Sequence, residues 1–239
     1  MDPHSQEYDK QIAFHYQAYR PPLHEKILSE VIENQGFEWG LDIGSGTGRS
    51  AVALKKYCKF VLGIEPSSAM LRKCHESQDI EYRLGGCEDI PENKIQFDIV
   101  TLAGSLYYCK SARSIAEVRR VCKIGSLVVI YDFEVRLEET LNRLSLKTSS
   151  KPSPYDHAVN LHGAEGFIEQ TCWSRPYELK VTSAQIEHVI LSNKERYSQV
   201  IDNFGNLKAF REGINSIFTE AKSALETQLY LAAYTLESK

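Results

Sequence analysis

The sequence lacks the features that mark several common classes of protein. None of its six cysteines stands in a CxxC pair or beside two histidines at zinc-site spacing, so we expect no metal site. No apolar run approaches the ~20 residues that a membrane span needs. The N-terminal segment MDPHSQEYDK has neither a basic start nor an apolar core, which argues against a secretory signal. The Gly-x-Ser-x-Gly elbow of many hydrolases is also missing.

An excess of positive charge is missing as well. The 28 lysines and arginines are outnumbered by 32 aspartates and glutamates, which gives a formal net charge of −4. This balance argues against a nucleic-acid partner held by bulk charge. The cysteines are scattered, and several lie in apolar stretches, as in a chain that stays reduced. We therefore expect a cytoplasmic protein without a membrane partner. The sequence leaves its oligomeric state open.

Apolar and amphipathic segments alternate over residues 23–134. The expected strands are 37–43, 59–65, 80–84, 97–103 and 125–134, and the expected helices are 20–34, 47–57, 67–77 and 111–122. Strands 97–103 and 125–131 are apolar on both faces, which fits burial between two layers of helices. This alternation predicts an α/β fold with a doubly wound, mostly parallel, Rossmann-like sheet of seven strands and helices on both faces.

The alternation fails after residue 135. Residues 142–163 are polar, contain two prolines and are expected to form a loop. The later expected elements are strands at about 176–183 and 226–237, with helices 183–204 and 207–222 between them. Two helices in that place would lie outside the layers of the sheet, so we predict an inserted C-terminal helical cap. We expect one integrated domain, in which residues 1–135 supply the N-terminal helix and the cofactor-binding half, and residues 136–239 complete the sheet.

Three glycines at alternate positions follow the first expected strand, in the segment LDIGSGTGRS, residues 41–50. A strand that ends in such glycines and opens a helix lets the backbone approach a ligand, and the helix N-terminus adds amide hydrogens and partial positive charge. Residues 46–51 also satisfy GxGxxA, so the motif alone does not exclude a dinucleotide.

Two acids near this loop bear on the choice of ligand. Asp42 would repel a pyrophosphate by ~4 kcal/mol for unit charges about 4 Å apart at an effective dielectric of about 20. A phosphate-free cation such as S-adenosylmethionine would be tolerated there. Glu65 ends the second expected strand and can accept hydrogen bonds from both hydroxyls of an adenosine ribose. Dinucleotide enzymes use the same device, so Glu65 predicts an adenosine ligand without choosing between cofactors.

Five segments in order resemble the class I S-adenosylmethionine-dependent methyltransferases, in particular the small-molecule group with a D-x-G-x-G-x-G motif. The segments are LDIGSGTGRS, VLGIEPSSAML, GGCEDIP, FDIVTLAGSLYYC and EVRRVCKIGSLVVIYD. An earlier segment, YQAYRPP, resembles the Y-x-x-x-R-P stretch of this group. The match covers residues 16 to about 134, and the last hundred residues match less well. The resemblance implies an enzyme of class EC 2.1.1 that moves a methyl group from S-adenosylmethionine to a small-molecule acceptor.

The resemblance also implies a set of cofactor contacts. Those residues are Arg20 at the cofactor's carboxylate, Gly44, Ser45 and Gly46 at its methionine part, Glu65 at the ribose, Pro66, Met70, Cys87 and Glu88 at the adenine, and Ala103 with Gly104 beneath the sulfonium. Asp42, at the mouth of the glycine loop, is counted with the cofactor site. The sequence departs from the pattern at Gly86, where the family places an aspartate that accepts from the adenine amine. Either Glu88 or water would take that role.

Methyl transfer from a sulfonium releases a neutral leaving group, so alignment and exclusion of water matter most. A general base is needed only for a hydroxyl, an acidic carbon or a protonated amine. The candidates for the acceptor pocket are Tyr16, Tyr19, Tyr107, Tyr108 and His157. Tyr107, Tyr108 and His162 are candidates for a catalytic role, which the sequence does not assign.

Two other interpretations stay open. The first is an NAD(P)-dependent oxidoreductase on a similar sheet, which Asp42 argues against. The second is a non-catalytic, cofactor-binding protein with the methyltransferase fold, which the departure at Gly86 and the lack of an obvious base leave possible. Nitrogen, oxygen, sulfur and carbon nucleophiles are all served by this fold, so the acceptor cannot be read from these motifs.

Overall fold

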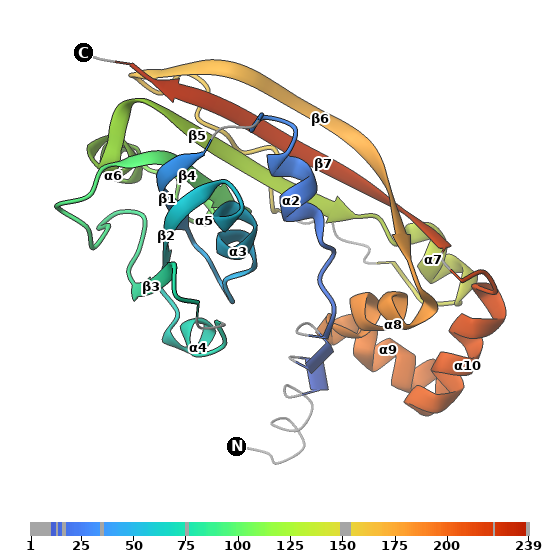
Figure 1. Cartoon of the computed structure of the whole chain (residues 1–239). Helices are drawn as coiled ribbons and strands as arrows, with labels where there is room; N and C mark the ends of the chain where they lie inside the picture. The colour runs from blue at the N-terminus through green and yellow to red at the C-terminus, as the bar shows by residue number, and fades with distance from the viewer. Residues whose placement is uncertain are drawn as a thin grey trace. The chain divides into compact units, whose positions relative to one another are not determined.

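The structure is a computed structural model that describes residues 11–12, 14–15, 18–33, 36–74, 77–148, 154–221 and 223–237. Seven strands form one sheet in the order β3-β2-β1-β4-β5-β7-β6 (Figure 1). The strands are β1 (Phe37–Ile43), β2 (Cys58–Glu65), β3 (Ile80–Leu84), β4 (Phe97–Ala103), β5 (Cys122–Val135), β6 (Phe167–Val181) and β7 (Ser223–Leu236). The predicted seven-stranded α/β fold is confirmed.

The first five strands run parallel to one another. On β1, Leu41 lies opposite Leu62 of β2 and opposite Val100 of β4. β3 pairs parallel with β2, and β5 pairs parallel with β4. The chain therefore turns back at β1, with β2 on one side and β4 on the other. In doubly wound sheets a crevice forms at the carboxyl ends of the strands at such a point.

Helices cover both faces of this half of the sheet. They are α2 (Leu23–Leu28), α3 (Arg49–Lys55), α4 (Ser68–Leu71), α5 (Leu106–Cys109) and α6 (Ala112–Val121). Alternate residues of a strand face opposite sides. A Cβ on Gly40 would lie 3.0 Å from Cδ2 of Leu54 in α3, whereas Leu41 and Ile43 belong to the buried cluster that includes Val118 of α6. Figure 1 shows α3 and α6 on opposite sides of the strands.

The chain divides into two compact units, each built from several segments. One unit comprises Pro22–Glu134, Pro154–Arg175 and Leu229–Lys239, and the other comprises Met1–Pro21, Val135–Ser153 and Pro176–Gln228. The predicted boundary near residue 135 falls where the chain passes from the first of these units to the second. That the two form one integrated domain stays a prediction.

The second unit contains a group of helices inserted between β6 and β7. These are α8 (Ser183–Leu191), α9 (Lys194–Phe204) and α10 (Leu207–Ile217), and α7 (Glu138–Arg143) follows β5. α8, α9 and α10 contact one another, and the predicted helical insertion is confirmed. The expected single helix 183–204 is two helices because the Asn193 side chain accepts from the Arg196 amide at 3.0 Å and begins a new helix. That this group covers the cofactor stays a prediction.

Two other elements differ from the expectation. β6 begins at Phe167, well before the expected strand at about 176–183. It includes Pro176, which is tolerated because β6 is an edge strand. α4 ends at Leu71 and has no buried residue. Within the described part of the chain, no helix has both the length and the hydropathy that crossing a membrane requires.

Candidate active site

A cavity of about 640 Å³ opens where β1, β2 and β4 end. Its lining includes Gly44, Glu65, Pro66, Ala103, Gly104 and Ser105. The volume lies within the range of about 300–1,000 Å³ that is usual for small-ligand sites. The position is the crevice beside β1 that this strand order predicts.

The glycine loop is packed closely against its surroundings. Gly44, Gly46 and Gly48 have φ of +75°, +55° and +86°. Residues other than glycine rarely adopt this backbone conformation. A Cβ on Gly44 would lie 2.4 Å from Cβ of Ser105, and one on Gly48 would lie 2.4 Å from the Tyr82 hydroxyl oxygen. A Cβ on Gly46 would meet nothing within 4 Å. Gly44 thus lets the loop approach the end of β4, and Gly46 serves the turn itself.

Asp42 lies beneath this loop and not at its mouth. Its side chain is 0% exposed, and it accepts hydrogen bonds from Ser50 at 2.5 Å and from Thr101 at 2.8 Å. Burial raises the pKa of Asp42 from 3.8 to about 6, although these two hydrogen bonds lower it. The carboxylate therefore ties β1 to α3 and β4. This placement corrects the interpretation that Asp42 faces the ligand and repels a pyrophosphate directly.

Glu65 ends β2 and lines the cavity. Its Oε2 accepts a hydrogen bond from the Gly46 amide at 3.0 Å, and its Oε1 accepts one from the Ser67 amide at 2.9 Å. A carboxylate oxygen can accept two hydrogen bonds, so each oxygen keeps capacity for a ligand hydroxyl. The side chain is fixed in place by backbone from two loops.

A short segment after β3 forms another part of the lining. Cys87, Glu88 and Asp89 all border the cavity. Oε1 of Glu88 accepts from the Ser111 hydroxyl at 2.5 Å, which leaves its other oxygen for a ligand. A Cβ on Gly86 would meet nothing within 4 Å. Asp89, which the sequence reasoning missed, brings a second acid to the place where the family's aspartate is lacking.

The charge of this cavity has one sign. Among the described residues that line it, Glu65, Glu88 and Asp89 are acidic, and none is lysine or arginine. Anions that bind in such sites are usually met by arginine, lysine or a helix N-terminus. The lining therefore favours a cationic ligand over one with phosphates. This observation replaces the argument that rested on Asp42.

A cluster of polar side chains adjoins the cavity at Gly104. Tyr155 donates to the Gly104 carbonyl at 2.7 Å and is 2.9 Å from Oδ2 of Asp132. The same oxygen of Asp132 lies 2.7 Å from Nδ1 of His157. Burial lowers the pKa of His157, but the hydrogen bond and charge of Asp132, with the charges of Glu134 and Asp156, raise it above its ordinary value of 6.5. Asp132 and Tyr155 were missed at the sequence level.

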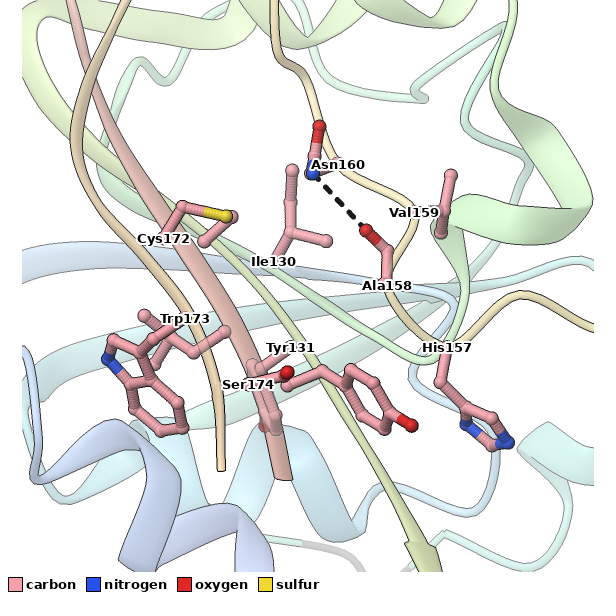
Figure 2. Close-up of a pocket in the computed structure, with 12 residues that line it drawn as sticks. Ile130, Tyr131, His157, Ala158, Val159, Asn160, Cys172, Trp173 and Ser174 are labelled. Atoms are coloured by element: carbon pink, nitrogen blue, oxygen red, sulfur yellow. Dashed lines mark hydrogen bonds between the residues drawn. The ribbon is translucent and has the colours of Figure 1, made fainter. Parts of the chain in front are cut away.

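His157 also borders a smaller cavity of about 160 Å³. Figure 2 shows two of the segments that line it: residues 157–160, and Cys172 to Ser174 of β6. The Asn160 amide donates to the Ala158 carbonyl at 3.2 Å and shapes the first segment. The rings of Tyr131 and Trp173 contribute to the lining. The smaller cavity is thus partly aromatic, and none of its described lining residues is lysine or arginine.

The structure brings part of the predicted site together. The predicted residues that line the larger cavity are Gly44, Glu65, Pro66, Cys87, Glu88, Ala103, Gly104 and Tyr108. Ser45, Gly46 and Met70 do not line it; the Ser45 hydroxyl turns inward and would be 3.1 Å from a Cβ on Gly63. Whether each lining residue contacts the cofactor stays a prediction.

The other candidates for the acceptor side lie in different places. Tyr108 is 77% exposed and borders the larger cavity, whereas Tyr107 lines neither cavity and donates to the Pro154 carbonyl at 2.9 Å. His162 is exposed, and its Nδ1 lies 3.4 Å from Oε2 of Glu169. It lines neither cavity. Tyr19 and Arg20 belong to the other unit, so their predicted contacts stay predictions. Tyr16 lies outside the described residues.

Comparisons with known proteins identify the family. Residues 41–130 match the methyltransferase domain family. The chain is 26% identical to a putative methyltransferase of Dictyostelium discoideum over 49% of this chain and 46% of that protein. It is 29% identical to a probable S-adenosylmethionine-dependent methyltransferase of Saccharomyces cerevisiae over 81% of this chain and 64% of that protein. These matches support a class I S-adenosylmethionine-dependent methyltransferase. The matches span about half to two thirds of these relatives' lengths.

The fold of this methyltransferase has a counterpart among solved structures. A putative type II methyltransferase from Anaeromyxobacter dehalogenans superposes with a TM-score of 0.63 at 16% identity, covering 92% of this chain and 98% of that one. The likeness therefore extends beyond residues 41–130 to the later strands and the helical insertion. At this identity it concerns the fold alone.

The cofactor of this family is S-adenosylmethionine, and the geometry of the larger cavity fits it. Glu65 offers two anchored oxygens that suit the ribose hydroxyls. Gly44 and Gly104 lie in its lining without side chains that would fill it. Glu88 and Asp89 suit an adenine amine, and the three carboxylates together suit a ligand with a positive sulfur. In this methyltransferase, these residues would hold the cofactor.

Proposed function

We propose that this chain transfers a methyl group from S-adenosylmethionine to a small-molecule acceptor. The observation that carries the proposal is the carboxylate of Glu65, held by the Gly46 and Ser67 amides at the edge of an acidic cavity. The bound cofactor supplies a methyl group on a positively charged sulfur. The role of the protein is to anchor the nucleoside, align the acceptor and exclude water.

A small acceptor is supported by the size and charge of the site. The cavity of about 640 Å³ has the size of a site for small ligands. The formal net charge of −4 and the acidic lining argue against a nucleic-acid acceptor. The cytoplasmic location is part of the same proposal: all six cysteines are free thiols, as in a reducing compartment.

The alternative of a nicotinamide-dependent oxidoreductase has less support. A dinucleotide would bring two phosphates to a lining that offers Glu65, Glu88 and Asp89 and, among the described residues, no arginine or lysine. The Asp132–His157 pair beside the cavity argues against the non-catalytic alternative, because a protein that only holds the cofactor does not need this polar cluster.

Isothermal titration of the purified chain tests the proposal. We expect S-adenosylmethionine and its demethylated product, S-adenosylhomocysteine, to bind, and NAD⁺ to bind far more weakly. Binding of NAD⁺ with equal affinity, or no heat with either S-adenosyl compound, would refute the proposal. Incubating a cell extract with the chain and a donor that carries a deuterated methyl group, followed by mass spectrometry, would then reveal the labelled acceptor.

A further inference from the structure

The cluster at Gly104 contains chemistry that the cofactor does not require. Gly104 lines the larger cavity, and a Cβ on it would lie 3.1 Å from Oδ1 of Asp132. The resemblance to the family places the sulfonium over Ala103 and Gly104. Asp132, Tyr155 and His157 are not among the lining residues of this cavity. They are grouped next to Gly104, beside the place where the methyl group would be transferred.

We propose that Asp132, Tyr155, His157 and Tyr230 form the acceptor subsite, that the acceptor is a positively charged amine, and that its nitrogen gives a proton to His157. This inference rests on the proposed function and names the substrate class of the same site. All four residues belong to the unit that contains the larger cavity.

The charges around His157 support a cationic acceptor. Asp132 and Glu134 come from β5, and Asp156 comes from the preceding loop; all three raise the pKa of the imidazole, against the lowering by burial. Neither cavity has a lysine or arginine among its described lining residues. A carboxylate or phosphate on the acceptor would find no basic partner there, whereas an ammonium would gain about 1–4 kcal/mol from one carboxylate about 4 Å away.

Aromatic rings supply the second feature of a cation site. The centroid of the Tyr155 ring lies 4.6 Å from that of the His157 ring. The Tyr230 ring stacks on the His157 ring, with a centroid distance of 5.5 Å and an angle of 13° between the ring planes. Tyr107 and Tyr108 lie 4.6 Å and 5.5 Å from Tyr155. Ring faces attract cations by about 0.5–2 kcal/mol, so the combination of rings and carboxylates selects an ammonium over a neutral group of the same shape.

His157 is arranged to take a proton. Its Nδ1 is engaged by Asp132, and no described residue forms a hydrogen bond with its Nε2. Asp132 thus orients the ring and stabilises the imidazolium, which is the usual role of a carboxylate behind a histidine base. The side chain of His157 is 25% exposed, so Nε2 can reach a ligand. The smaller cavity beyond it has room for substituents of the acceptor (Figure 2).

The step balances as follows in atoms and charge. The ammonium N–H bond breaks, and its proton goes to Nε2 of His157. The freed lone pair on nitrogen forms the new bond to the methyl carbon, while the carbon–sulfur bond breaks and its electron pair stays on sulfur, which becomes a neutral thioether. The product is a methylated ammonium, and the His157 imidazolium later releases its proton to water.

Two isosteric probes test recognition without knowledge of the natural acceptor. Choline and 3,3-dimethyl-1-butanol have the same shape and differ in one positive charge. The full chain is titrated with each probe, alone and saturated with S-adenosylhomocysteine. We expect choline to bind at least ~10-fold more tightly. Equal affinity for the two probes, or no choline binding, would overturn the amine assignment, and binding of S-adenosylhomocysteine in the same experiment would leave the proposed function standing.

Matched variants tie the preference to the cluster. Asp132→Asn should remove the preference for choline, whereas Glu165→Gln, which removes the same charge at an exposed position, should keep it. Choline affinity should fall from about pH 8.5 to about pH 5.5 because protonated His157 repels the cation, and this dependence should disappear in His157→Gln. A pH dependence that persists in His157→Gln, or a preference that survives Asp132→Asn in a folded chain, would contradict the proposal.

Transfer of a deuterated methyl group tests the proton step. A panel of primary, secondary and tertiary amines, beginning with 2-(dimethylamino)ethanol, is compared with the matching alcohols. We expect labelled product from amines, and a rate ~10²-fold lower in His157→Gln than in the wild type. Label on alcohols only, or on no amine in a chain that binds S-adenosylhomocysteine, would overturn it.

Discussion

The Gly46 amide donates a 3.0 Å hydrogen bond to Oε2 of Glu65, which ties the glycine loop after β1 to the carboxylate that ends β2. The Ser67 amide holds the other oxygen at 2.9 Å. Two adjacent loops therefore share one acid, and the acid keeps one accepting position on each oxygen. The carboxylate that we propose for the nucleoside is therefore already held in place by the protein's own backbone.

Glu65→Gln tests this arrangement. The side chain keeps its size, but its nitrogen cannot accept from a backbone amide and its charge is lost. Hydrogen bonds to charged groups contribute about 1.5–3 kcal/mol, so the Kd for S-adenosylhomocysteine should rise about 10- to 150-fold in isothermal titration. Glu165→Gln, an exposed control, should bind like the wild type. Unchanged affinity in Glu65→Gln would place the ribose elsewhere.

Gly44→Ala should destabilise the fold. The glycine has φ of +75°, and the new Cβ would lie 2.4 Å from Cβ of Ser105. We expect the free energy of unfolding to fall by about 1–3 kcal/mol in urea denaturation. Gly86→Ala is the matched control, because its Cβ would meet nothing within 4 Å. Equal stability of the two variants would contradict the close approach of Gly44 to Ser105.

Asp42→Asn should change how stability depends on pH. The folded pKa of Asp42, about 6, lies above the ordinary 3.8 because of burial, so the folded state favours the protonated acid. The wild type should therefore lose up to about 3 kcal/mol of stability as pH rises from about 4 to about 7. The neutral variant should lack this loss. Denaturant titrations at several pH values compare the two, and parallel curves would contradict the buried carboxylate.

Asp132→Asn should lower the pKa of His157. In the wild type this pKa lies above 6.5, because the hydrogen bond and charge of Asp132 outweigh the effect of burial. The interaction stabilises the fold below about pH 6.5, and the stabilisation is lost as pH rises through the folded pKa. Histidine NMR titration measures the change, with His157→Gln used to assign the signal. If the pKa of His157 is the same in Asp132→Asn as in the wild type, the contact between these two side chains is contradicted.

The parallel half of the sheet could be predicted because apolar and amphipathic segments alternate over residues 23–134, and because strands 97–103 and 125–131 are apolar on both faces. The expected strands 37–43, 80–84 and 97–103 have the bounds that the structure gives. β6 was placed too late because its first residues are mostly exposed and polar, as an edge strand allows. α4 was drawn too long because its sequence favours a helix, yet none of its residues is buried to support further turns.

The nucleoside side of the site was more predictable than the acceptor side. Gly44 and Glu65 directly follow or end an apolar strand, so the sequence already places them at the edge of the sheet. Asp132 carries the same signal, an acid near the end of an apolar strand, and could have been found. Tyr155 lies in an irregular loop and reaches Asp132 only through the fold. No local pattern indicates that contact.

The side of the strand that Asp42 faces could also have been read from the sequence. Leu41 and Ile43 belong to the core cluster on the α6 face, and a strand alternates with a period of two. Asp42 must then face α3, where Ser50 meets it. Its position next to the glycine motif suggested a ligand contact, but adjacency along the chain does not decide which way a strand residue points.

The carboxylates of Glu65, Glu88 and Asp89 would attract S-adenosylmethionine more strongly than its demethylated product, S-adenosylhomocysteine. Methyl transfer removes one positive charge from the sulfur, so the attraction that draws the reactant in is weaker for the thioether left behind. The spent nucleoside would then dissociate more readily than its precursor, and added salt would narrow the difference by screening. A negatively charged lining would thus favour release of the product, so that the product inhibits the enzyme less.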